Sequence, residues 1–150
     1  MSKANGQDQT APDTSRSYRL DDQVGFILRR ATQRHLAVFA ERIPDLTPTQ
    51  FATLAKLMEL GPVPQIQLGR HTAMDAATVK GVIDRLSKRG YVTTRPDSED
   101  LRRVIVAPSA TGEALFQQYV AAAHDVTSVT LNPLTAAEQD IFLGLLRKLI

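Results

Sequence analysis

Hydrophobic residues recur at steps of three and four along most of the chain, which is the period of an amphipathic helix. The first such stretch starts at Leu20, continues through Val24, Leu28 and Val38, and ends before Pro44, because proline cannot continue a helix. This pattern predicts one helix of about 24 residues. Further helices are predicted over residues 47–60, 65–70, 75–89, 111–130 and 135–149.

Polar residues at the predicted helix starts can accept hydrogen bonds from backbone amides that a helix leaves unpaired. The segments Thr47–Gln50 and Thr135–Glu138 both have the spacing of a capping box. Asp75 is the predicted N-cap of the helix over 75–89, and Gly90 is its predicted stop. In the short helix over 65–70, we expect Ile66 and Leu68 to face inward.

Two segments after the helix over 75–89 are rich in β-branched and aromatic residues, Tyr91–Arg95 and Val104–Val106. A charged loop separates them, so they predict a β-hairpin. Two short helices joined by a tight turn at 71–74 and followed by a hairpin form a winged helix-turn-helix. The predicted fold is therefore mainly α, with a small β-hairpin as the wing.

Composition restricts the class of protein. The chain has 150 residues and no cysteine, which excludes a disulfide scaffold and a thiolate metal site. No apolar run reaches the ~20 residues that a membrane helix needs, and the polar N-terminus lacks the hydrophobic stretch of a signal peptide. Residues 1–17 show no apolar period and are predicted to be a disordered tail. We expect a cytoplasmic protein without membrane contact.

The net charge of +2 is unevenly distributed along the chain. Residues 70–103 hold eight basic and five acidic side chains, so this segment carries +3 while the other 116 residues sum to −1. A local basic segment is typical of proteins that bind nucleic acid. A solvated charged surface gives the same pattern, so charge alone does not decide between the two.

The polar face of the helix over 75–89 suits the major groove of DNA, which is about 12 Å wide and admits one helix. Thr78 and Lys80 can reach bases or phosphates from this face, and small side chains permit close approach. Arg85, Lys88 and Arg89 lie further along the helix and suit phosphates, which position a protein without reading sequence. The predicted DNA-binding residues of this helix are Ala77, Thr78, Lys80, Gly81, Arg85 and Lys88.

The hairpin loop supplies two arginines, Arg102 and Arg103. A guanidinium that enters a narrow minor groove senses its shape and negative potential. Asp100 lies two residues before Arg102 and can orient it by a charge-assisted hydrogen bond. An exposed ion pair that contributes almost nothing to stability is the alternative for this triplet taken alone. The triplet follows the helix over 75–89, which is predicted to enter the major groove and is called the reading helix below. This position favours the DNA-binding interpretation.

Three segments resemble the MarR family: Leu46–Phe51 (LTPTQF), Thr78–Val92 (TVKGVIDRLSKRGYV) and Asp97–Val106 (DSEDLRRVIV), with Gly112 downstream. The resemblance extends over about residues 20–150. Ala107-Pro108-Ser109 departs from the family pattern at the base of the wing. Gly81 also departs, because many members carry a larger polar residue there.

The resemblance implies a six-helix homodimer of winged-helix regulators, usually repressors, that bind a pseudo-palindromic site on double-stranded DNA. Residues 18–45 and 109–150 would form the dimerisation helices, and residues 46–108 the DNA-binding domain. The apolar stripes of the first helix and of the last two helices are consistent with a dimer. They are too extensive for a three-helix DNA-binding domain to cover. A dimer would place its two reading helices roughly 34–36 Å apart.

The resemblance also implies a small-molecule effector, often an aromatic acid and in one subgroup a nicotinate-type compound. Arg30, Arg34, His35 and Phe39 on the first helix could hold an anionic aromatic ring by charge and stacking. The alternative is a core histidine bonded to a carbonyl, with the arginines on a solvated or interfacial face.

Other functional classes find little support in the sequence. His35, His71 and His124 lie far apart and lack metal-ligand spacing, so we expect no metal and no cofactor. No nucleophile, phosphate-loop or zinc-protease motif occurs, so we expect no enzyme and no catalytic residues. A winged helix used only for protein contact remains the alternative, and its binding would barely respond to salt, unlike DNA binding.

Overall fold

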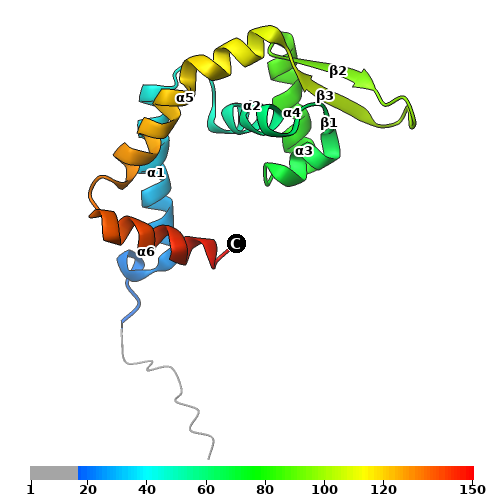
Figure 1. The fold of residues 1–150 in the computed structure, drawn as a ribbon. Helices are drawn as coiled ribbons and strands as arrows, with labels where there is room; N and C mark the ends of the chain where they lie inside the picture. Colours follow the sequence, from blue (N-terminus) through cyan, green and yellow to red (C-terminus); the bar gives the residue numbers. More distant parts are fainter. Residues whose placement is uncertain (1–16) are drawn as a thin grey trace, which may run out of the picture. The chain divides into compact units, whose positions relative to one another are not determined.

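The structure is a computed structural model that describes residues 17–150 (Figure 1). The predicted tail over 1–17 lies outside the described residues except for its last position. The described residues fall into two compact units, one that ends at Thr32 and one over Gln33–Ile150. The helices of the described part are α1 (Val24–Arg42), α2 (Pro48–Leu60), α3 (Gln65–His71), α4 (Ala76–Lys88), α5 (Ala110–Leu131) and α6 (Ala136–Arg147), and the strands are β1 (Val63–Pro64), β2 (Val92–Pro96) and β3 (Val104–Pro108).

The first helix starts later than its apolar pattern predicts. A single 3-10 turn covers Leu20–Asp22, and Gln23 is extended with φ −88° and ψ 131°. The carbonyl of Gln23 accepts a hydrogen bond from the amide of Ile27 at 3.0 Å, so α1 begins at Val24 and has 19 residues. The expected length of about 24 residues is wrong. Apolar side chains continue at helical steps across Gln23, although the backbone is not helical there.

The predicted helix caps are confirmed. Both capping boxes form, Thr47 with Gln50 and Thr135 with Glu138. The Asp75 carboxylate accepts a hydrogen bond from the Thr78 amide at 2.7 Å. Gly90 follows the end of α4 with φ 76°, in the left-handed region where a side chain would be strained.

The hydrophobic core of the larger unit is built from helices α1 to α5 and the sheet. The predicted inner face of α4 is confirmed, since Val79, Val82, Ile83 and Leu86 are all buried. Burying a side chain of this size contributes about 1.5–3 kcal/mol of transfer free energy. The core thus fixes which side of α4 remains outward. Its fully buried side chains also include Ile43, Leu54, Leu57, Leu68 and Val106.

The sheet has three strands rather than the two of the predicted hairpin. Its order is β1-β3-β2, and β1 pairs with β3 through Val63↔Val106 and Pro64↔Ile105. A two-residue edge strand that contains a proline carries no periodic signal, which explains why the sequence did not reveal it. Of the two side chains of α3 expected to face inward, Leu68 is fully buried, whereas Ile66 is 65% exposed.

The departure from the family pattern at Ala107–Ser109 leaves the wing base well formed. The Ser109 hydroxyl donates to the Gly90 carbonyl at 2.5 Å and accepts from the Gly112 amide at 3.0 Å. Gly112 lies so near β2 that a Cβ there would approach the Tyr91 carbonyl oxygen to 2.0 Å. These contacts join the start of α5 to the first strand of the wing.

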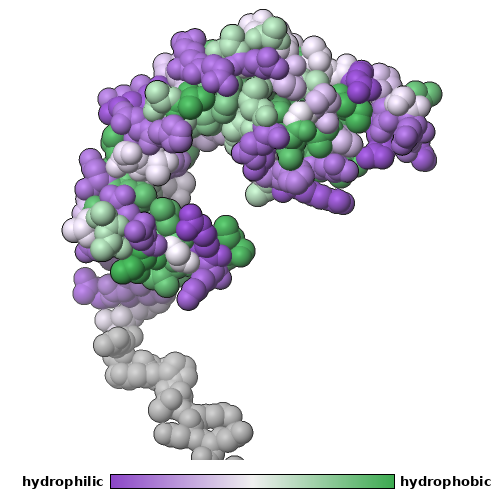
Figure 2. Space-filling view, in the orientation of Figure 1, coloured by the Kyte–Doolittle hydropathy of each residue, from purple (hydrophilic) through white to green (hydrophobic). Residues whose placement is uncertain are grey.

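The apolar stripes of the outer helices are largely uncovered within one chain. No residue of α6 is buried, and Ile141, Leu145 and Leu149 are 63%, 55% and 71% exposed. Figure 2 shows hydrophobic surface over this helix. On α1, Val24 and Ile27 are also exposed. Within residues 17–150, no helix has both the length and the hydropathy needed to span a bilayer.

Candidate nucleic-acid interface

A close packing of α3 against α4 positions the predicted reading helix. The Met74 amide donates to the Gly69 carbonyl at 2.9 Å, and Ala73 adopts φ 54° to make the turn. A Cβ on Gly69 would lie 3.2 Å from the Val79 side chain. The turn leads directly into the Asp75 cap, so α4 starts in a defined direction.

The outward face of α4 carries the residues predicted to bind DNA. Gly81 is half-buried, and the others are exposed: Ala77, Thr78, Lys80, Arg85 and Lys88. They lie opposite the side chains that hold α4 in the core, so α4 is amphipathic in the sense that groove binding requires.

Two contacts on this face were not expected from the sequence. The Lys80 ammonium pairs with Asp84 at 2.7 Å, one turn along the helix. The Arg85 guanidinium folds back over Gly81, within 4 Å of where a Cβ would stand. The absence of a side chain at Gly81 therefore also leaves room for Arg85 to lie along the helix surface.

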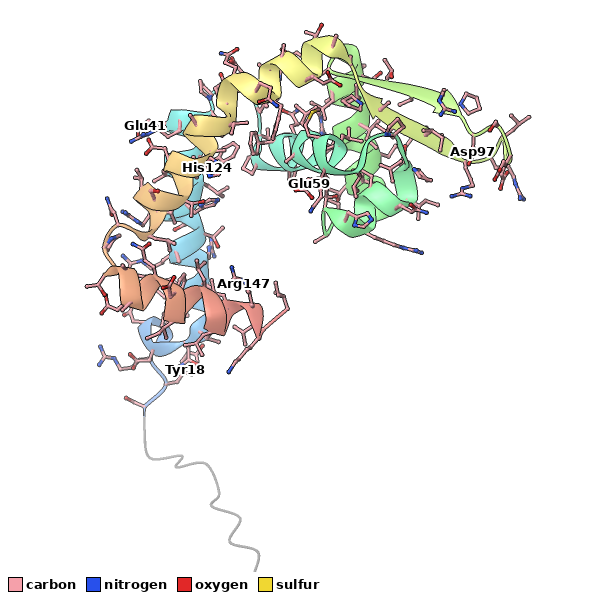
Figure 3. The ribbon with its side chains drawn as sticks, viewed as in Figure 1. Tyr18, Glu41, Glu59, Asp97, His124 and Arg147 are labelled. Carbon is pink, nitrogen blue, oxygen red and sulfur yellow. The ribbon has the colours of Figure 1, made fainter. Side chains whose placement is uncertain are left out.

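The wing holds its arginines through carboxylates of its own loop. Asp100 accepts hydrogen bonds from Arg102 at Nε (3.1 Å), Nη2 (3.3 Å) and the backbone amide (3.1 Å). These bonds lower the pKa of Asp100. The Arg102 side chain is 91% exposed, so it is oriented but open to a ligand. Arg103 lies 3.7 Å from Asp97, which Figure 3 places in the loop region of the hairpin.

Arg89 has a contact that the sequence did not indicate. Its guanidinium donates to the Asp45 carbonyl at 2.6 Å and lies 4.8 Å from the centre of the Tyr91 ring. The Tyr119 hydroxyl donates to the Asp45 carboxylate, which together with burial raises the pKa of Tyr119. Arg89 thus ties the end of α4 to the loop before α2, whereas sequence reasoning assigned it to phosphate contacts.

The residues proposed for an effector occupy different environments. Arg34 donates to the carbonyls of Val129 (3.0 Å) and Thr130 (3.3 Å) and to the Asn132 side chain (3.0 Å). Three acceptors at the C-terminal end of α5 thus engage Arg34, a favourable place for a cation. His35 Nδ1 lies 3.1 Å from the Thr130 hydroxyl.

Phe39 and Arg30 are the other two residues of that predicted set. Phe39 is buried and packs edge-on against Phe51, with ring centres 6.1 Å apart. It also lines a hollow of about 580 Å³ that reaches Leu36 and Arg89. Arg30 is exposed on the earlier part of α1. The larger unit therefore brings Arg34 and His35 together at the end of α5, with Phe39 as a core residue.

Metal-ligating side chains do not gather in the described part of the chain. No group of three His, Cys, Asp or Glu residues suitable for a metal ion occurs within residues 17–150.

Arg70 is a basic residue near the reading helix that the sequence analysis counted but did not assign. It lines the hollows on both sides of α3, one of which also contains Arg102 and Arg103. The available sequence signal for Arg70 was its place in the basic segment. Its position along the chain did not indicate that it lies beside the wing.

Comparisons with known proteins agree with this geometry. The MarR family model matches residues 46–104. The HTH-type transcriptional repressor NicR of Pseudomonas putida is 39% identical over 143 residues, which cover 94% of this chain and 90% of that protein. A probable transcriptional regulator from Pseudomonas aeruginosa is 53% identical, with a TM-score of 0.85 over 88% of this chain and all of that one.

A third relative is BpsR of Bordetella bronchiseptica, described in a study of the regulation of its DNA binding by 6-hydroxynicotinic acid. It is 39% identical, with a TM-score of 0.85 over 89% of this chain and 96% of that one. The predicted family, the winged-helix fold and the expectation of a regulator rather than an enzyme are thereby confirmed. The chain belongs to the MarR family of DNA-binding transcriptional regulators.

Proposed function

We propose that the chain is a homodimeric repressor that binds a pseudo-palindromic operator and leaves it when a small aromatic acid binds. The observation that carries the DNA-binding part is the combination of an outward basic face on α4 with a wing arginine held by Asp100. A repressor of this kind acts in the cytoplasm, where it meets double-stranded DNA.

In this proposal α4 enters the major groove, and the wing enters the adjacent minor groove. Thr78 and Lys80 read base edges or nearby phosphates, Ala77 and Gly81 permit close approach, and Arg102 enters the minor groove. The phosphate-contacting residues are Arg85, Lys88 and Arg103, and Asp100 orients Arg102. Residues 46–108 act as the DNA-binding domain.

Residues 18–45 and 109–150 act as the dimerisation helices. Their exposed apolar side chains support this assignment, because a monomer would leave Ile141, Leu145 and Leu149 in water. A two-fold dimer presents two copies of α4 to half-sites one helical turn apart, roughly 34–36 Å. The operator is then a pseudo-palindrome.

The effector is an aromatic carboxylate, and a nicotinate-type acid is the first compound to test. The chemistry of BpsR, whose DNA binding is regulated by 6-hydroxynicotinic acid, supports this class. Arg34 and His35 supply cationic and polar groups at the end of α5, and the hollow beside Phe39 offers apolar walls for a ring.

The repressor proposal is tested with fluorescent promoter fragments from the DNA that flanks the gene. We expect tight binding to one fragment, a steep loss of affinity with rising salt, and release by an aromatic acid. Binding of a protein partner with little salt dependence, and no binding to any fragment, would instead support a winged helix used only for protein contact.

The effector site is tested by isothermal titration with nicotinate- and benzoate-type acids. We expect the Arg34→Ala/His35→Ala variant to lose both acid binding and acid-induced operator release. The ligand must prefer one conformation for release, and moving the balance from 99:1 to 1:99 needs about 5.5 kcal/mol of such preference. Undiminished binding and release in this variant would place the effector site elsewhere in the protein.

A further inference from the structure

One acidic side chain lies among the residues of α4 that we propose to bind DNA. Asp84 belongs to the outward face of this helix, and its side chain is 56% exposed. Residues three or four positions apart lie on the same side of a helix. Asp84 is therefore on one line with Ala77, Gly81 and Lys88, opposite the buried side chains of α4. This line faces the floor of the major groove when the helix enters it.

The other positions on this line offer few groups that could recognise a base. Ala77 and Gly81 have no polar side-chain atoms, and Lys88 lies in the last turn of the helix. Because Ala77 and Gly81 are small, the middle of α4 can approach the base edges closely. The short side chain of Asp84 then comes within reach of those edges, so it is the polar group on the line that is best placed to read them.

The contacts of the Asp84 carboxylate leave one of its oxygens available. The Lys80 ammonium donates to Oδ2 of Asp84 at 2.7 Å, whereas Oδ1 accepts no hydrogen bond from the described part of the chain. Lys80 also offsets the negative charge of Asp84, which the phosphates of the two DNA strands would otherwise repel. Asp84 can thus enter a groove as part of a neutral pair, with Oδ1 open to a hydrogen-bond donor of the DNA.

The hydrogen-bonding edges of the bases determine which of them suits this acceptor. In the major groove guanine presents two acceptors, thymine presents an acceptor and a methyl group, and adenine presents a donor beside an acceptor. Cytosine presents the N4 donor and no acceptor. An ionised carboxylate only accepts hydrogen bonds, so cytosine is the base that it can contact without facing a second acceptor.

We propose that Asp84 is a specificity-determining residue that accepts a hydrogen bond from N4 of one cytosine in each operator half-site. This inference rests on the proposed function and adds the identity of one base to it. Lys80 stays beside the carboxylate and neutralises it in the groove. At a site without that cytosine, Asp84 loses its hydrogen bond and faces an acceptor or a methyl group, so it also acts against binding to the wrong sequence.

The test is a selection of bound duplexes from a library that is randomised over about 30 base pairs, enough for two half-sites one helical turn apart. The full-length wild type should enrich cytosine at one position of each half-site. Asp84→Asn keeps the size of the side chain, and an asparagine bonds N6 and N7 of adenine. We therefore expect its preference at that position to change from cytosine to adenine. Asp84→Ala should lose the preference there and keep the other selected positions.

Fluorescence anisotropy on the selected duplexes measures the size of the effect. Exchanging the selected C·G pair for A·T should weaken wild-type binding about fivefold or more, whereas Asp84→Asn should not lose affinity. Glu59→Gln is the matched control, because Glu59 forms a similar exposed pair with Lys56 on α2, at 2.5 Å. It changes the net charge by the same amount and should select the wild-type sequence. Circular dichroism checks that each variant folds.

The selection separates failure of this inference from failure of the proposed function. If the wild type and both Asp84 variants enrich the same sequence, Asp84 reads no base, even where the variants bind every duplex more tightly through their changed charge. A change of preference at a position where the wild type does not select cytosine would overturn the cytosine assignment. In both cases the proposed function stands. If the wild type enriches no sequence at all, the sequence-specific regulator fails, and this inference fails with it.

Discussion

Single side chains decide how the wing presents its charge. The guanidinium of Arg102 would sample many rotamers in an unrestrained loop, and ordering it on DNA would cost conformational entropy. Asp100 limits that freedom with hydrogen bonds to both Nε and Nη2 of Arg102. The pair is exposed and adds little to folding stability, so its value lies in pre-orienting the arginine.

Replacing Arg102 by alanine should weaken operator binding by ~1–3 kcal/mol per site, about fivefold to 160-fold, if the guanidinium makes a good groove contact. Asp100→Ala should weaken it less, because the arginine remains but loses its orientation. Fluorescence anisotropy across a salt series measures both effects. Wild-type affinity in both variants would contradict the wing assignment.

Gly112 is a position where the backbone of Tyr91, just before β2, leaves no room for a side chain. Gly112→Ala should destabilise the fold by ~1–3 kcal/mol or more, because a Cβ would overlap the Tyr91 carbonyl oxygen and force α5 away from β2. Thr111→Ala, one exposed residue earlier on α5, is the control and should be nearly neutral. Urea unfolding measures both variants, and equal midpoints would show that the helix start adjusts freely.

At the scale of elements, α4 depends on its cap as well as on its buried face. Hydrogen bonds from the backbone and side chain of Thr78 lower the pKa of Asp75. A pKa that is lower in the folded state means that the carboxylate stabilises the fold above its ordinary value of 3.8. This contribution is lost as the pH falls below that value, through the folded-state pKa.

The comparison of Asp75→Asn with the wild type tests this account, because asparagine caps a helix without titrating. We expect the melting temperature of the wild type to fall more steeply than that of Asp75→Asn between about pH 5 and pH 2. Asp75→Ala should melt lower than both at pH 7. Parallel pH profiles for wild type and Asp75→Asn would show that the carboxylate charge adds nothing.

At the scale of the whole molecule, the exposed apolar side chains of α6 predict that folding and association are coupled. Leu145→Asp should shift sedimentation toward a monomer, remove the concentration dependence of the melting temperature and weaken operator binding. Asp140→Ala, a polar change on the same helix, should do none of these. A wild-type protein that stays folded and monomeric at micromolar concentration would refute the dimer.

Much of this protein follows from local sequence patterns, since caps and amphipathic periods act within a few residues. The inner face of α4, both capping boxes, the Gly90 stop and the hairpin were all predicted. The Asp100–Arg102 contact also follows from residues two positions apart. Local signals failed at the start of α1, where the apolar period continues across the extended Gln23.

Contacts between distant segments were decided only by the tertiary structure. Strand β1 exists because Val63 and Pro64 lie against β3, not because of any signal of their own. Arg34 reaches the end of α5 across 95 residues, and Arg89 reaches Asp45 across 44. Arg70 joins the wing arginines in one hollow for the same reason. Sequence periodicity reports which face of an element is apolar, but the partner of a polar side chain depends on which distant backbone the packed core places beside it.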